Sequence, residues 1–550
     1  MASQLFRTKP LSMLLAEEAG SHRLRRVLGP VQLTALGVGA IIGTGIFILT
    51  GVAAHDRTGP ALMLSFVMAG LACVFAALCY AEFASMVPVA GSAYTYAYAT
   101  LGELFAWIIG WDLILEYAVG SATVAHGWSA HFQEFIPIFH EGLSWIPAKI
   151  PEIFRSAPVN YCVNVDVKGG CPHTGFVSTG SWFDLPAILI TFILTIVLVK
   201  GIKESASFNA VMVAVKLVIV LMVIGIGGYL VLTVYGTSNW HPFAPYGYTG
   251  VSFFGKTILG GHAAGGEPLG MFAGAAIIFF AYIGFDSVSV HSEEAREPAK
   301  DVPKGIIYSL IICTILYIAV SAVLTGMVPY KEINIDAPVV DAFKRAGLVW
   351  MQYLVAAGAM TGITSVLLVM MLSQPRVMLA LGRDGLVPNS FFGDVHPKWR
   401  TPWKSTILTG VFVAVMAGLI PLSILAEMTS IGTLFAFVIV CGAVLVMRKT
   451  NPNANRPFRA PFVPLVPILG IATCLLLMFS LPYENWVRLI VWLLVGLIIY
   501  FAYGRRHSVM SRHTAHEIGT HGLSPAGQAV GDPDAPPSSP ADPIDSRIKK

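Results

Sequence analysis

Two charged side chains stand in the middle of apolar stretches and are the first candidates for chemistry. Lys216 lies in "VMVAVKLVIVLM" and Glu116 lies in "WDLILEYAVG". A charge buried in a membrane costs at least a few kcal/mol, so each side chain needs a partner or a role. A desolvated amine can exchange its proton near neutral pH, which predicts a proton-carrying role for Lys216. The alternative is a permanent ammonium group that stabilises the structure.

Glu116 shares a helix face with Asp112, four residues earlier, and is the deeper of the two carboxyl groups. Three roles remain open for it. It can meet a cationic group of a substrate, relay protons, or form a hydrogen bond to a neighbouring helix.

A glycine-rich stretch, "GVGAIIGTGIF" at 37–47, is the second candidate. Its spacing differs by one residue from the dinucleotide fingerprint, and it lies inside an apolar run without a strand before it, so we reject a phosphate-binding loop. Gly39 and Gly43 have the spacing of close helix packing. The cluster Gly43-Thr44-Gly45 goes beyond that spacing and predicts an interruption of the helix within the membrane.

A second stretch, "AIIFFAYIGFDSVS", predicts a matching interruption. Gly284 lies within the apolar run, and Asp286 and Ser287 after it are residue types that begin helices. Half-helix N-termini attract anionic groups and unwound carbonyls attract cationic ones. A pair of interrupted helices therefore suits a zwitterionic head group such as that of an amino acid.

The composition indicates the elements that must hold these residues. Of 550 residues, 55% are hydrophobic and 12% are charged, against roughly 25% charged in soluble domains. We count about twelve apolar runs long enough to cross a bilayer. They lie near 31–53, 61–86, 102–130, 184–200, 207–234, 269–288, 306–328, 350–381, 405–421, 424–447, 463–481 and 486–504.

The two predicted interruptions fall in spans one and six, which are five spans apart. This spacing predicts an all-α membrane protein with two inverted five-helix repeats, at 31–234 and 269–447, followed by two further helices at 463–504. Residues 1–30 form an N-terminal segment, and 507–550, rich in Pro, Ser, Asp and Gly, are expected to be a disordered tail.

The basic residues predict the orientation. With both termini in the cytoplasm, most Lys and Arg residues lie on the cytoplasmic side, including those at 7–26, 376–404 and 448–459. The first thirty residues lack the apolar core of a cleavable signal peptide. The net charge of +4 is too small to suggest a nucleic-acid partner.

Seven cysteines are present, and five of them fall in predicted spans. Cys162 and Cys171 flank "VNVDVKGG" in an extracytoplasmic loop, where disulfides persist, and we predict that they are joined. No metal-ligand spacing, catalytic Ser/His/Asp set or nucleotide loop is recognisable, so we expect no metal, no cofactor and no enzymatic activity.

Four motifs together resemble a known family. "GAIIGTGIF", "FFAYIGFDSVS", "EEAREPAKDVPKGI" and "RVMLALGRDGLVP" with "VHPKWRTP" are similar to the amino acid–polyamine–organocation (APC) superfamily, and most to bacterial relatives of the cationic amino acid transporter (CAT) family. The resemblance covers about residues 25–505. It implies a LeuT-like fold with helices one and six broken.

The resemblance also implies a substrate site. Ile41, Ile42, Gly43, Thr44 and Gly45 would bind the head group, with the amides of Thr44 and Gly45 facing the carboxylate. The carbonyls of Phe280, Ala281, Tyr282 and Ile283, together with that of Ile41, would face the α-ammonium. The resemblance further implies that a lysine on span five, here Lys216, couples transport to protons. Met360 in span eight is a candidate contact for the substrate side chain, and core packing is its alternative role.

These features predict a proton-coupled symporter of L-amino acids in the plasma membrane. An amino acid or polyamine exchanger (antiporter) with the same fold is the alternative. The choice between a cationic and a small neutral substrate stays open, as do the oligomeric state and a small accessory membrane subunit.

Overall fold

The computed structural model describes residues 5–10, 28–87, 92–142, 149–162, 175–200, 205–254, 256–263, 268–292, 295–335, 337–399 and 401–510. Most of these residues are helical, because long runs of Leu, Val, Ile and Ala satisfy their backbone groups within each helix. The predicted tail lies almost entirely outside the described residues.

Eight helical stretches among the described residues are long and apolar enough to cross a membrane. They are 45–86, 103–137, 211–235, 271–290, 298–327, 349–383, 422–450 and 483–507. Four shorter apolar helices accompany them: α3 (Pro30–Ile41), α9 (Leu185–Lys200), α17 (Trp403–Leu419) and α19 (Leu465–Ser480). The first predicted span is divided, since α3 ends at Ile41 and the helix that follows leads directly into the second predicted span.

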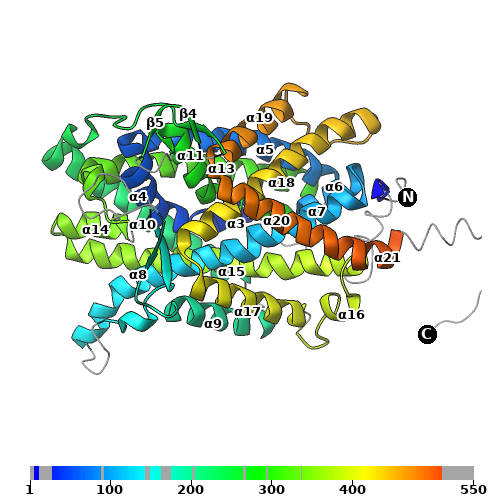
Figure 1. Ribbon diagram of the computed structural model, residues 1–550, viewed down its shortest axis with the longest axis horizontal. Helices are drawn as coiled ribbons and strands as arrows, with labels where there is room; N and C mark the ends of the chain where they lie inside the picture. Colours follow the sequence, from blue (N-terminus) through cyan, green and yellow to red (C-terminus); the bar gives the residue numbers. More distant parts are fainter. Residues whose placement is uncertain are drawn as a thin grey trace, which may run out of the picture.

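The main helices within the long stretches carry the labels of Figure 1. They are α5 (Leu62–Met86), α7 (Glu103–Ile114), α8 (Gly120–Gly142), α10 (Ser205–Leu230), α11 (Met271–Ile278), α13 (Pro298–Met327), α15 (Val349–Arg383), α18 (Leu422–Thr450) and α20 (Tyr483–Ile499). Shorter helices are α4 (Thr50–Ala53), α6 (Ser92–Thr100), α12 (Ser287–Val290), α14 (Pro338–Arg345), α16 (Asn389–Phe392) and α21 (Arg505–His507).

Helices distant in the sequence pack side by side. α13 lies against α5 and α3, α15 lies against α8, and α10 lies between α13 and α15. α9 and α17 run together along one edge of the molecule, and α18 packs against α19 (Figure 1). The short helix α3 is thus surrounded by α10, α13 and α15, which places its end in the interior.

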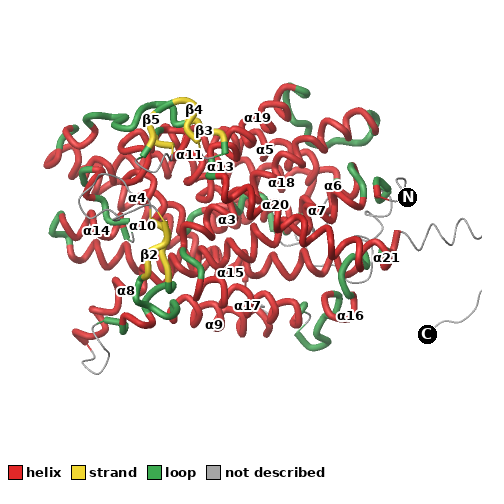
Figure 2. Tube along the Cα trace, in the orientation of Figure 1, coloured by secondary structure: helices red, strands yellow, loops and turns green. Residues whose placement is uncertain are grey.

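The strands form three short antiparallel pairs. β1 (Val159–Cys162) pairs antiparallel with β2 (Gly175–Ser178), β3 (Val251–Phe253) with β4 (Lys256–Leu259), and β5 (Gly261–His262) with β6 (Pro268–Leu269). β3, β4 and β5 lie at the upper edge of the molecule in Figure 2. Cys162 is opposite Gly175 in the first pair. Cys171 lies outside the described residues, so the predicted disulfide stays a prediction.

Segments near the two ends of the chain meet at one end of the molecule. The Lys9 ammonium group lies 2.9 Å from the Asp384 carboxylate at the end of α15. Arg7 donates a hydrogen bond to the carbonyl of Met510, at 3.2 Å. Residues 7–9 therefore lie close to the ends of the described helical body at Asp384 and Met510. The cytoplasmic orientation of the termini stays a prediction.

Candidate functional site

The first interruption begins where α3 ends. Ile42 leaves the helical conformation, with φ −74° and ψ 103°, and helical structure resumes from Thr44 onward. Gly43 is packed so closely against α15 that a Cβ atom would lie 2.7 Å from Val366 Cγ2. The predicted interruption is present, and a glycine is required there because the neighbouring helix leaves no room for a side chain.

The second interruption follows α11. A 3₁₀ turn at Phe279–Tyr282 gives way to an extended Ile283 and then to Gly284 with φ +117°, a conformation that favours glycine. A Cβ atom on Gly284 would lie 2.8 Å from the carbonyl oxygen of Ala40. The Ser287 hydroxyl donates to the Gly284 carbonyl at 2.5 Å. The second predicted interruption is therefore also present, and it touches the end of α3.

Backbone and a single hydroxyl group connect the two interruptions. A Cβ atom on Gly45 would collide with the Cα atom of Ala281. The two backbone segments therefore meet without side chains between them. The Tyr317 hydroxyl of α13 lies 2.8 Å from the carbonyl oxygen of Ile41 and 2.8 Å from that of Ala281. The Tyr317 hydroxyl thus lies between one carbonyl from each interruption, and among the described residues neither carbonyl accepts a regular helical hydrogen bond.

Lys216 of α10 is fully buried and reaches the first interruption. Its Nζ donates to the carbonyl oxygens of Gly39 at 2.5 Å and Ile42 at 2.9 Å, and to the Ser365 hydroxyl at 3.1 Å. All three ammonium hydrogens have an acceptor. The positive charge lies at the C-terminal end of α3, where the helix dipole is negative, and both effects stabilise the bent backbone.

Glu116 lies elsewhere, at the inner side of the second interruption. Its fully buried carboxyl group faces that of Asp286, the second residue after Gly284. Tyr117 donates to Asp286 Oδ2 at 2.5 Å. Within the described residues neither carboxyl oxygen of Glu116 has a hydrogen-bond partner, so its three predicted roles stay open.

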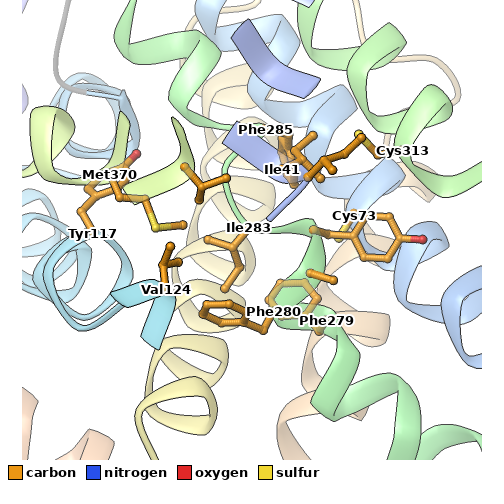
Figure 3. Packing of buried hydrophobic residues seen from close by; sticks show 14 of the residues in the cluster. Ile41, Cys73, Tyr117, Val124, Phe279, Phe280, Ile283, Phe285, Cys313 and Met370 are labelled. Atoms are coloured by element: carbon orange, nitrogen blue, oxygen red, sulfur yellow. The ribbon is translucent and has the colours of Figure 1, made fainter. Parts of the chain in front are cut away.

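Apolar side chains from three segments meet near the interruptions. Figure 3 shows Val124 of α8 and Met370 of α15 beside Phe280 and Ile283. All four side chains are buried. They pack together as part of the buried hydrophobic core.

Met360 is not among these four side chains. The face of α15 toward the first interruption carries Gly362, Ser365 and Val366. Met360 is half-buried and lies two residues before Gly362, which corresponds to about 200° around the helix. Met360 is therefore half-buried at the edge of α15, and its contact with a substrate side chain stays a prediction.

The structure brings most of the predicted residues together. The segments 41–45 and 280–283 are adjacent, and Lys216 contacts the first of them. The side chain of Tyr282 points away and donates to the Phe66 carbonyl at 2.8 Å. Tyr317 and Ser365 were missed, although a tyrosine within an apolar span is a signal, since its hydroxyl must find a partner.

No group of His, Cys, Asp and Glu side chains in the described part of the chain has the arrangement of a metal site. The polar groups at the interruptions are backbone amides, carbonyls, hydroxyls and one ammonium group, with the carboxyl groups of Asp286 and Glu116 beside the second interruption. Such a set can hold a small molecule that carries both charges, by hydrogen bonds to its anionic and cationic groups.

Comparison with known proteins agrees with this geometry. The amino acid permease family model matches residues 28–503. The chain belongs to the amino acid permease family. This permease is therefore a multi-pass membrane protein of a transporter family and not an enzyme, and the resemblance to the APC superfamily is confirmed.

Three relatives illustrate the range of the family. The permease is 45% identical to a branched-chain amino acid permease of Bacillus subtilis (strain 168), over 93% of this chain and 100% of the relative. It is 43% identical to a methylthioribose transporter of the same organism, with the same coverage. It is 38% identical to a vacuolar cationic amino acid transporter 4 of Arabidopsis thaliana, over 82% of this chain and 68% of the relative.

Proposed function

We propose that the permease is a proton-coupled symporter of neutral L-amino acids that works by alternating access in the plasma membrane. The observation that carries this proposal is the contact of the Lys216 ammonium group with the carbonyls of Gly39 and Ile42. A group that gains and loses a proton is thereby bonded directly to the backbone that shapes the predicted substrate site.

The substrate head group binds between the two interruptions. The amides of Thr44 and Gly45, at the start of the second half-helix, bind the carboxylate. The carbonyls of 280–283 and of Ile41 bind the α-ammonium. Support comes from the close approach of Gly45 to Ala281, which brings both sets of backbone groups together.

Proton movement changes the first interruption. The protonated Lys216 holds α3 against α10 and α15 through its three acceptors. Loss of the proton removes at least one of these hydrogen bonds and the favourable charge at the end of α3. The helix then moves more freely, and the substrate leaves toward the cytoplasm. The two protonation states thus favour two different access states.

The lining of the site favours a neutral side chain. Val124, Phe280, Ile283 and Met370 are apolar and lie near one another (Figure 3). The Glu116 carboxyl group interacts with that of Asp286. Apolar side chains of this kind suit aliphatic amino acids better than lysine or arginine. The name of the branched-chain relative agrees with this choice.

The architecture that we propose is the LeuT-like arrangement of two inverted repeats, 31–234 and 269–447, with two additional helices. Both interruptions occupy corresponding positions in these repeats. The proposal includes cytoplasmic termini, which the basic residues favour and which the meeting of Lys9 with Asp384 supports.

The deciding experiment measures uptake of radiolabelled amino acids into proteoliposomes with and without an inward proton gradient. The wild-type protein is expected to accumulate substrate only when the gradient is present. Lys216→Met keeps the length of the side chain and should abolish the driven accumulation in a folded protein. Lys216→Arg should also fail, because guanidinium stays protonated at any relevant pH.

Two outcomes would contradict this mechanism. Driven accumulation by Lys216→Arg at nearly the wild-type rate would show that Lys216 is a permanent structural ammonium group. Uptake that needs internal substrate and ignores the proton gradient would identify an exchanger.

A further inference from the structure

His131 of α8 is a buried polar side chain that the transport mechanism above does not use. Its exposed fraction is 0%. Nδ1 lies 2.9 Å from the carbonyl oxygen of Gly127, and a carbonyl only accepts, so Nδ1 carries a hydrogen. In the neutral ring Nε2 is then an acceptor. Within the described residues it has no hydrogen-bond partner.

Thr44 supplies a second buried polar atom without a partner. Its side chain is 1% exposed, and no described residue forms a hydrogen bond with Oγ1. The hydroxyl lies against Gly127, where a Cβ atom would be 2.6 Å from Thr44 Oγ1. Gly127 is thus in contact with both groups, through its carbonyl to His131 and through its open side to Thr44.

Both groups contact the first interruption or the half-helix that follows it. Val124, Gly127 and His131 are spaced i, i+3 and i+7, so they share one face of α8. Val124 on this face borders Phe280 (Figure 3). The His131 ring packs edge-on against Phe47, with 6.0 Å between ring centroids. This face of α8 therefore runs alongside the first interruption, from the predicted substrate site toward the half-helix that contains residues 45–49.

We propose that Thr44 Oγ1 and His131 Nε2 form a polar subsite that binds the side-chain hydroxyl of a neutral amino acid of the serine and threonine type. The proposal rests on the proposed function and adds a specificity-determining residue, His131. The substrate hydroxyl donates to Nε2 and accepts from the Thr44 hydroxyl, which satisfies both buried groups. A substrate with a methyl group at the same place leaves Thr44 Oγ1 and His131 Nε2 without a hydrogen-bond partner. Such a substrate therefore binds more weakly.

The experiment compares L-threonine with L-valine, which differ by a hydroxyl in place of a methyl group and have nearly the same shape. Binding of each is measured by isothermal titration to the purified full-length protein. His131→Phe keeps an aromatic ring against Phe47 and removes the acceptor. The wild type should prefer threonine, and the affinity ratio of threonine to valine should fall about tenfold in the variant, as expected for one hydrogen bond.

Thr44→Val provides a second test that does not alter α8. It removes the hydroxyl and keeps the branched shape, and it should also lower the ratio. Both groups bind the same substrate hydroxyl. The fall in the threonine-to-valine affinity ratio in the double variant should therefore be much smaller than the product of the falls in the two single variants. His126→Phe is not a suitable control for His131→Phe, because it would break the hydrogen bonds that both ring nitrogens of His126 form. Serine and alanine serve as a second ligand pair.

The outcomes separate this proposal from the proposed function. Binding of amino acids with a threonine-to-valine ratio that neither variant changes would overturn the subsite and leave the transporter proposal intact. Binding of other amino acids without binding of serine, threonine, alanine or valine would do the same. Absence of binding by every amino acid would overturn both.

Discussion

The two interrupted helices differ in how their backbone groups are held. At the first, the carbonyls of Gly39 and Ile42 accept from the charged Lys216. At the second, the carbonyls of Ala281 and Gly284 accept from the neutral hydroxyls of Tyr317 and Ser287. In the proposed mechanism Lys216 gains and loses a proton, whereas a tyrosine or serine hydroxyl stays neutral at physiological pH. Under the proposed mechanism the proton response therefore belongs to the first interruption, and the second keeps a constant binding geometry.

The largest effect is expected where the two interruptions meet. Gly45→Ala adds a methyl group that overlaps Ala281, so the chains must separate. Overpacking of this kind costs about 1–3 kcal/mol, and amino acid affinity should fall by roughly tenfold to a hundredfold. Titration of the purified variant measures the loss. Because Gly45→Ala disturbs both interruptions together, it should impair substrate binding without distinguishing the role of the first interruption from that of the second.

Gly225→Ala is the matched control for this substitution. A Cβ atom at Gly225 of α10 has no neighbour within 4 Å, so the same methyl group should leave affinity unchanged. Wild-type affinity in Gly45→Ala would show that the head group binds elsewhere.

A medium effect is expected from Tyr317→Phe, which removes the hydroxyl shared by Ile41 and Ala281. Loss of one buried hydrogen bond should weaken substrate binding about tenfold. The dependence of uptake on the proton gradient should remain, because Lys216 keeps all its acceptors. Measurement of affinity and of gradient dependence in the same preparation separates the two effects.

Tyr308→Phe, on the exposed side of the same helix, is the control for Tyr317→Phe. If Tyr317→Phe abolished the gradient dependence and spared affinity, the assignment of the proton response to the first interruption alone would be contradicted.

The smallest effect is expected from Ser365→Ala. The Ser365 hydroxyl is the most distant of the three Lys216 acceptors, and both carbonyls remain in its absence. Proton-driven uptake should fall no more than about threefold, which corresponds to less than 1 kcal/mol. Initial uptake rates over a range of external pH values would show it. Complete loss of driven uptake would mean that the hydroxyl, and not the α3 carbonyls, holds the proton-carrying group in position.

Ser373→Ala is the matched control on the same helix, since the Ser373 hydroxyl bonds only to a carbonyl one turn earlier among the described residues. Its uptake should equal that of the wild type.

Much of the fold and site follows from local patterns. Long apolar runs predict membrane helices because only internally bonded backbone is tolerated in lipid. Glycine clusters at 43–45 and at Gly284 predict the two interruptions, because glycine is both a weak helix former and the residue that fits a close backbone approach. Lys216 stands out because a charge without nearby polar residues in the sequence requires a distant partner.

The partners themselves were decided by tertiary structure. Lys216 meets Gly39 and Ser365, which are 177 and 149 residues away in the chain. Met370 lies beside Phe280 and Ile283 because the rotation of α15 is set by its packing against α8 and α10. The sequence by itself determined where the helices break and which charge is buried. Only the assembled bundle decided which groups meet at those breaks, since contacts between helices depend on their packing and not on spacing within one segment.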